Sequence, residues 1–270
     1  MNLFKYEFKK LFKPMIIWTV VCVVCIVLFM SFYPMMEDSG MQEFVGDKLE
    51  VMPEAMKEAF NLSGTVDFSK LSDYTLYVIQ YIAMASGIYG AILGVSSLVK
   101  EESEGTIEFL YSKPIKRSSI VTAKLLASSL IFFIFILLLA VSNLIVSYII
   151  RPENISFVDV FKDLKVLYIG ILFLGSIFIS IGFLISVFIK SAKKAVPIAL
   201  AIFFITYVFG ILGDLKKELS GFLYLSPFNY AFPGDILKSG FQLRYVLTGF
   251  IIIFISIVST YFIYNKKDFA

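Results

Sequence analysis

The most chemically informative stretch of the sequence is EESEGTIEFLYSKPIKRSSIVTAK, residues 101–124. Its first half places four carboxylates around a short apolar edge formed by Ile107, Leu110 and Tyr111. Such an edge is costly to expose to water, so a docking surface for another protein explains it better than a solvated loop does. The carboxylates of this docking segment are Glu101, Glu102, Glu104 and Glu108.

Catalytic chemistry is not indicated elsewhere in the chain. Cys22 and Cys25 form a C-x-x-C pattern, which can be a redox or metal site, but the sequence has no histidine and no second cysteine pair. An aspartyl protease needs two membrane carboxylates, and the nearest candidates, Asp73 and Asp214, lie at the ends of apolar stretches. A P-loop needs a Gly-Lys dipeptide, which does not occur. The sequence therefore predicts no enzyme, no metal site and no cofactor in this chain.

The elements that position the docking segment are strongly apolar. Hydrophobic residues make up 59% of the chain and charged residues 17%, whereas soluble domains have about 45–50% and about 25%. A membrane-spanning helix needs roughly 20 apolar residues. We predict an all-α membrane protein in which residues 1–270 form a single transmembrane domain. Its six spans are expected at about 14–36, 74–99, 121–150, 166–189, 195–213 and 243–265.

The N-terminal sequence MNLFKYEFKKLFKP has the spacing of an amphipathic helix. Phe4, Phe8, Leu11 and Phe12 fall on one face of such a helix, and the lysines fall on the opposite half. This pattern predicts an interfacial helix over residues 1–13, with Pro14 marking the turn into the first span. A basic flank that only sets the topology explains the same residues equally well.

Basic residues are unevenly distributed along the chain. Fourteen of the 24 Lys and Arg residues lie in the segments 1–13, 100–124, 190–194 and 266–270. Because cytoplasmic loops carry an excess of Lys and Arg, these segments and both termini are expected to be cytoplasmic. Segments 37–73 and 214–242 are then extracellular. We expect a multi-pass protein of the cell membrane whose basic residues face anionic lipid, with no role in binding nucleic acid.

Small residues inside the second span predict close helix packing. They would let another helix approach closely, either in this chain or in a second copy. They are Ala83, Gly87, Gly90 and Gly94. Between the charged residues at their ends, the spans contain no Asp, Glu, Lys, Arg or His, which argues against a proton-coupled transporter. Polar residues inside the spans, such as Asn143 and Ser176, are expected to form hydrogen bonds between helices.

The segment before the last span is too polar to cross a membrane and too apolar for a simple loop. Its aromatic run is interrupted by prolines, which favours short helices that enter the membrane from outside. Such re-entrant helices are tolerated where protein or water satisfies their backbone. The residues of this outer re-entrant segment are Ser226, Pro227, Phe228, Tyr230 and Pro233.

Two of these stretches resemble the permease subunits of ABC transporters of the type 2 exporter family. E-E-x-x-G-T-I-E-x-L-x-S-K-P-I-x-R-x-x-I-x-x-x-K, which ends at Lys124, is similar to the segment that follows the second span in that family. YLSPFNYAFPGDILKSG is similar to the Ser-Pro-Phe-x-Tyr stretch before its sixth span, although the family's Tyr-Phe-Asp run is replaced by Tyr230-Ala231-Phe232. With the amphipathic N-terminus and six spans, the resemblance covers essentially the whole chain.

The resemblance implies that the docking segment is a coupling helix that seats in a groove of a separate ATPase subunit. The matching positions and their neighbours are Glu101, Glu102, Glu104, Gly105, Thr106, Ile107, Glu108, Leu110, Pro114 and Arg117. It also implies two six-span permeases, as a homodimer or a heterodimer, above ATPase subunits that bind ATP and Mg.

The expected function is therefore that of an export permease powered by a partner ATPase. A path lined by aromatic residues, Ser and Thr without fixed charge suits a hydrophobic or amphipathic substrate, such as a peptide, a drug or a lipid. The alternative is a non-transporting scaffold or sensor that docks a cytoplasmic partner. That alternative accounts for the docking segment but not for six tightly packed spans and a re-entrant segment.

Overall fold

The computed structural model describes residues 3–36, 41–42, 46–48, 51–53, 56–57, 67–99, 103, 116–215, 217–231 and 233–267. The secondary structure in these ranges is helical, and six helices are long and apolar enough to cross a membrane. The predicted fold class, an all-α membrane protein with six spans, is confirmed.

Each predicted span lies largely within one long helix. The long helices are α1 (Leu3–Ser31) with its short extension α2 (Tyr33–Met36), α5 (Leu71–Val95), α8 (Arg117–Ile150), α9 (Phe157–Ser186), α10 (Ala195–Leu215, after the 3-10 turn η1, Ala192–Lys194) and α12 (Leu243–Lys266). Of these, α1 and α9 begin well before the predicted starts at residues 14 and 166. Short helices precede α12: the 3-10 helices η2 (Lys217–Leu225) and η3 (Pro227–Tyr230), then α11 (Pro233–Ser239). Several long helices extend beyond the predicted spans because helical hydrogen bonding continues past the charge-free residues.

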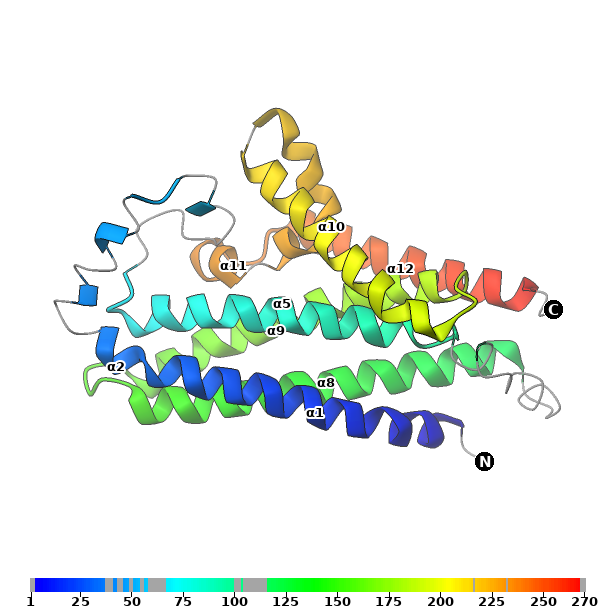
Figure 1. Ribbon diagram of the computed structural model, residues 1–270, viewed down its shortest axis with the longest axis horizontal. Coiled ribbons are helices and arrows are strands. Elements are labelled where there is room, and N and C mark those ends of the chain that lie inside the picture. The colour runs from blue at the N-terminus through cyan, green and yellow to red at the C-terminus, as the bar shows by residue number, and fades with distance from the viewer. Residues whose placement is uncertain are drawn as a thin grey trace.

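The long helices α1, α5, α8 and α9 lie side by side, with α12 and α10 on one side of them (Figure 1). Of the six, α5 and α9 are the most buried and form the centre of the bundle. Helix α10 leans away from this centre, and η2 returns alongside it (Figure 1). Because six spans cross the bundle an even number of times, both termini lie at the same end.

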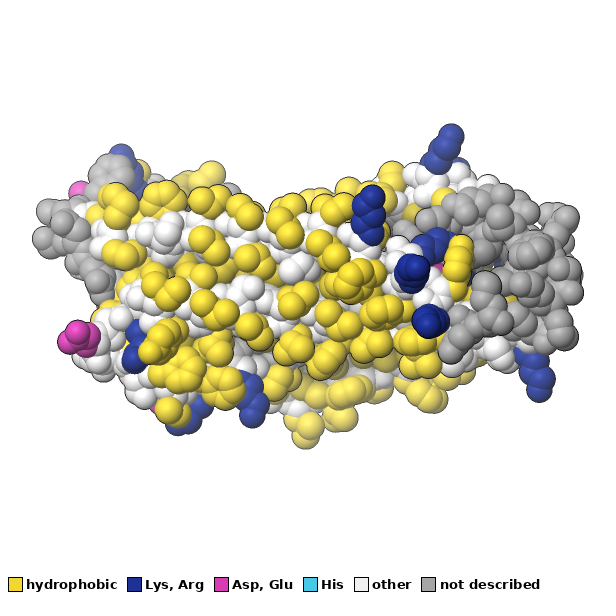
Figure 2. Space-filling model, turned by 90° about the horizontal axis from the view of Figure 1, so that it is seen from below, with side chains coloured by type: hydrophobic (Ala, Val, Ile, Leu, Met, Phe, Trp, Pro, Cys, Tyr) yellow, Lys and Arg dark blue, Asp and Glu magenta, His cyan; other side chains and the backbone are white. Residues whose placement is uncertain are grey.

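The outer faces of the peripheral helices are apolar. A broad band of hydrophobic side chains covers the face shown in Figure 2, and the Lys and Arg side chains lie toward the two ends of this face. On α12, Phe254 and Phe262 are 68% and 61% exposed. Such a band is expected to contact the hydrocarbon tails of membrane lipids.

The role predicted for Pro14 is wrong. Helix α1 runs through Pro14 without ending there, so residues 3–13 are the first part of the helix that forms the first span. Proline is tolerated inside membrane helices where neighbouring helices support the freed backbone groups. The interfacial position of residues 1–13 stays a prediction.

The polar residues inside the spans follow two patterns. The Asn143 amide donates to the Tyr168 hydroxyl at 3.2 Å, a hydrogen bond between α8 and α9 that confirms the expected role of Asn143. Ser147 extends this network by donating to the Asn143 carbonyl oxygen at 3.2 Å. Ser176 instead donates to the backbone carbonyl of Leu172 in its own helix, so the expectation of an inter-helix bond is wrong for that residue.

Candidate functional site

The docking segment lies mostly outside the described residues. This applies to Glu101, Glu102, Glu104, Gly105, Thr106, Ile107, Glu108, Leu110 and Pro114. Arg117, the remaining predicted coupling residue, is described and is the first residue of α8. The geometry around Arg117 therefore indicates where the docking segment joins the bundle.

Arg117 bonds to the end of α12. Its Nη1 donates to the backbone carbonyl of Asn265 at 3.1 Å and to that of Lys267 at 2.6 Å. The last carbonyls of a helix lack partners within the helix and carry partial negative charge, so a guanidinium is a favourable cap. The start of α8 is thus linked to the C-terminal end of the last span.

Two further contacts connect the same end of the bundle. Thr122 Oγ1 and Tyr261 Oη lie 2.7 Å apart and join α8 to α12. Lys267 Nζ donates to the Val187 carbonyl at 2.8 Å, just after the end of α9. A displacement of residue 117 would therefore be transmitted to α12 and, through the residue that follows it, to the end of α9.

Replacing Arg117 by glutamine should loosen the end of α12 without unfolding the bundle. Loss of a cation at a helix C-terminus costs about 1 kcal/mol, which corresponds to roughly fivefold faster local opening. Amide hydrogen exchange at residues 261–267 measures this change. Lys116→Gln removes an exposed charge from the neighbouring residue, and exchange in that variant should match wild type. Equal exchange in the two variants would show that Arg117 does not cap α12.

A buried ion pair lies near the same end of the bundle. Lys124 Nζ of α8 is 3.1 Å from Glu7 Oε1 of α1, and the two side chains are only 3% and 7% exposed. They line a cavity of about 200 Å³ together with Trp18, Tyr89 and Ser128. The sequence analysis did not identify this pair, because it treated Glu7 as part of a flank and Lys124 as the border of a span.

The small residues of α5 lie against α9 of the same chain. A Cβ atom on Gly90 would come within 2.9 Å of the Gly175 carbonyl oxygen, and one on Gly94 would come within 2.9 Å of Gly182 Cα. A Cβ on Gly87 would meet the rings of α9 and α10, and Ala83 is buried. Glycines on both helices thus let the two backbones approach closely.

The outer re-entrant segment is inserted between α9, α10 and α12. The Phe228 ring of η3 lies 5.6 Å from that of Phe178 and 5.0 Å from that of Phe203. Both partners lie eight residues from the docking-segment end of their helices, about 12 Å along the axis. The segment therefore reaches into the bundle between these helices, and its entry into the membrane from outside stays a prediction.

Backbone groups of this segment find partners within the protein. The amide of Asn229 donates to the Ser226 carbonyl at 3.1 Å, and the Tyr230 hydroxyl donates to the Tyr224 carbonyl. Ser226, Pro227 and Pro233 are buried as well. This satisfies the condition under which irregular backbone is stable at membrane depth.

These features define a polytopic membrane protein whose helices form a tightly packed bundle. A family model described as "ABC-2 family transporter protein" matches residues 1–269, and the chain therefore belongs to this family. It is a membrane permease component of an ABC transporter, which works with an ABC ATPase subunit and is not itself catalytic. No curated protein matches the chain.

Proposed function

We propose that the chain is the permease of an ATP-driven exporter that moves a hydrophobic or amphipathic substrate out of the cytoplasm or the inner leaflet. The observation that carries this proposal is the link from Arg117 to α12. A helix seated in an ATPase groove would move with the ATPase as it binds ATP. Because α8 begins at Arg117, that movement would reach α8 through the chain and α12 through the guanidinium.

The docking segment, the termini and the ATPase belong on the cytoplasmic side in this proposal. Both termini lie at the end of the bundle where α5 ends and α8 begins (Figure 1). The fourteen Lys and Arg residues in segments 1–13, 100–124, 190–194 and 266–270 support the same orientation through the positive-inside rule. ATP and Mg would be bound by the partner ATPase.

A second permease copy, identical or different, completes the proposed transporter. Support comes from the exposed apolar faces of α10 and α12, since only a small share of each of these two helices is buried within a single bundle. Part of this surface would contact the second permease and the rest would contact lipid. The path between two such permeases would carry aromatic and hydroxyl side chains, which suits an amphipathic substrate.

The coupling assignment is tested by Glu104→Lys, with Glu218→Lys in the exposed η2 as the matched charge reversal. Glu104→Lys should weaken binding of the partner ATPase about tenfold, since a like-charge contact at an interface costs at least about 1.4 kcal/mol. Co-purification and permease-dependent ATPase activity measure the effect. Glu218→Lys should behave as wild type. If the ATPase binds and responds equally with both variants, the docking segment does not couple the two subunits.

A further inference from the structure

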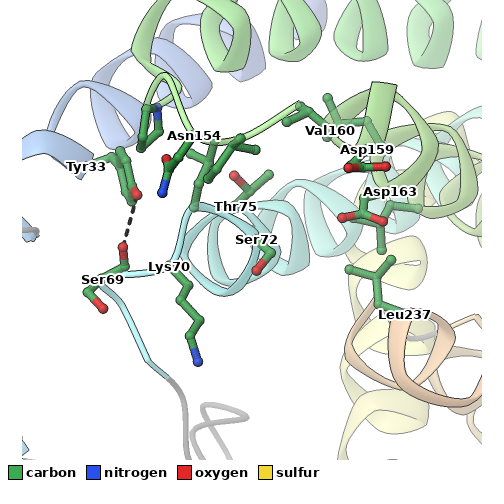
Figure 3. A pocket seen from close by; sticks show the side chains of 15 residues that line it. Tyr33, Ser69, Lys70, Ser72, Thr75, Asn154, Asp159, Val160, Asp163 and Leu237 are labelled. Carbon is green, nitrogen blue, oxygen red and sulfur yellow. Dashed lines mark hydrogen bonds between the residues drawn. The ribbon is translucent and has the colours of Figure 1, made fainter. Parts of the chain in front are cut away.

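A cavity of about 440 Å³ lies at the end of the bundle opposite the termini (Figure 3). It is enclosed by the starts of α5 and α9, by Tyr33 at the start of α2, by the turn before α9 and by Leu237 of α11. Sites for small molecules typically have about 300–1,000 Å³. The cavity is therefore large enough for a small amphipathic ligand.

The lining of this cavity combines an apolar surface with polar groups. Leu164, Leu167 and Leu237 contribute the apolar surface. The carboxylates of Asp159 and Asp163, one turn apart on α9, contribute negative charge beside it (Figure 3). Like charges four residues apart on a helix repel each other. A cationic ligand in the cavity beside the two carboxylates would therefore reduce this repulsion.

Two lysines near this cavity are each paired with an aspartate other than Asp163. Lys162 Nζ lies 3.5 Å from Asp159, with both side chains exposed. Lys70 Nζ lies 3.3 Å from Asp67, and in Figure 3 it points away from Asp159 and Asp163. The hydrogen bond from the Ser69 hydroxyl holds the pKa of Asp67 below its ordinary value, so Asp67 stays ionised and keeps Lys70.

Asp163 is left as a half-buried carboxylate that forms neither a hydrogen bond nor an ion pair with the residues that the structure describes. A carboxylate in that setting favours a cationic partner, because opposite charge compensates its lost hydration. The ligand would supply this partner.

Thr75 provides an independent indication of a ligand. Its side chain is 6% exposed and lines the cavity, and its hydroxyl forms no hydrogen bond within the described part of the chain. Helical threonines elsewhere donate to the carbonyl four residues back, as Thr122 does to Ser118. Figure 3 places Thr75 between Asn154 and the two aspartates. Because the Thr75 residue lines the cavity and its hydroxyl is not among the buried side-chain atoms that lack a partner, this hydroxyl is open to the cavity and can bond to a ligand there.

We propose that this cavity binds the primary ammonium group of an amphipathic molecule. Asp163 is the counter-ion, the Thr75 hydroxyl accepts a hydrogen bond from the ammonium, and the alkyl part packs on Leu164, Leu167 and Leu237. The substrate of the proposed exporter would then be a cationic amphiphile, which is released on the side of the membrane away from the ATPase. That role as a substrate site rests on the proposed function, whereas the binding itself does not.

The test is a calorimetric titration of hexylammonium into the full-length permease in phosphatidylcholine nanodiscs, without ATPase. Saturable binding is expected at one molecule per chain, and hexanol, the neutral counterpart, should give none. Asp163→Asn should weaken binding about tenfold or more, and Thr75→Val about threefold. The matched control is Glu153→Gln, which removes an exposed carboxylate at the same end that does not line the cavity.

Wild-type affinity in Glu153→Gln together with the loss in Asp163→Asn would support the site. Absence of saturable hexylammonium binding, equal weakening by both substitutions, or equal binding of hexanol would overturn it. Thr75→Val keeps the side-chain shape and carries the test if Asp163→Asn lowers the yield of folded protein. Because the ATPase is absent, failure here leaves the coupling proposal standing, and failure of coupling leaves this binding measurable.

Discussion

Replacing Lys124 by methionine is expected to destabilise the permease by about 3–5 kcal/mol, because Glu7 then remains as a buried carboxylate without its cation. For a chain of this size, that loss corresponds to a melting temperature roughly 6–20 °C lower. The effect is large because the two side chains are only 3% and 7% exposed. An exposed ion pair would contribute about 1 kcal/mol at most.

Trp18 provides the measurement. It is the only tryptophan of the chain, it lines the cavity that contains the ion pair, and its ring stacks 5.3 Å from that of Tyr89. Its fluorescence during thermal unfolding reports on the contact between α1 and α5. The control is Lys13→Met, which removes an exposed lysine from the same region. If the two variants melt at the same temperature, the ion pair does not hold α1 against α8.

The double variant Glu7→Gln with Lys124→Met distinguishes two effects on stability. One is the loss of the ion pair, and the other is the burial of a Glu7 carboxylate that has no cation beside it. Replacing both partners by neutral groups leaves no buried charge, so the double variant should melt above Lys124→Met alone. A melting temperature below that of the single variant would mean that Glu7 contributes through contacts other than the ion pair.

The sequence was sufficient to predict the elements that depend on composition. Charge-free length identified six membrane helices, since hydrocarbon excludes ionised side chains regardless of what the helices contact. The glycines of α5 were recognisable because small residues at helical spacing have few other uses in a membrane helix. Their partner helix was not predictable, since α9 and a second copy satisfy the same spacing.

The buried ion pair was missed because burial depends on which face of α1 meets the bundle. Glu7 lies on the same face as Met15 and Cys22, both of which are buried. Extending that face toward the N-terminus would have placed Glu7 inside and called for a cation nearby. The aromatic face of residues 4–12 was more conspicuous, yet Phe12 is 42% exposed.

The cavity of Figure 3 could not be predicted from the sequence either. Thr75, Asn154 and Asp163 come from three places along the chain, and no local motif joins them. Only the parallel packing of α5 and α9 brings the starts of these helices together. Asp163 precedes the predicted span 166–189, and in the sequence alone it reads as an ordinary charged residue between two spans.

Replacing Gly94 by alanine is expected to push α5 and α9 apart. Its new Cβ would lie 2.9 Å from Gly182 Cα and closer still to the Ile179 carbonyl oxygen, and both contacts are with backbone atoms. Side chains can adjust to an added methyl group, but a helix backbone must move as a whole. Overpacking of this kind costs about 1–3 kcal/mol, and we expect a loss near 3 kcal/mol with a melting temperature roughly 6–12 °C lower.

Two other glycines make this expectation specific. At Gly87 an added Cβ would meet the rings of Phe203 and Phe178 at 3.2 and 3.3 Å, a contact that small ring movements can relieve. At Gly221 in η2 nothing lies within 4 Å of an added Cβ, so alanine there should change stability by no more than about 0.5 kcal/mol. Thermal unfolding should therefore rank the alanine variants with Gly94 least stable, Gly87 intermediate and Gly221 like wild type. If alanine at Gly94 were tolerated as well as at Gly221, close backbone contact between α5 and α9 would not be what holds the centre of the bundle together.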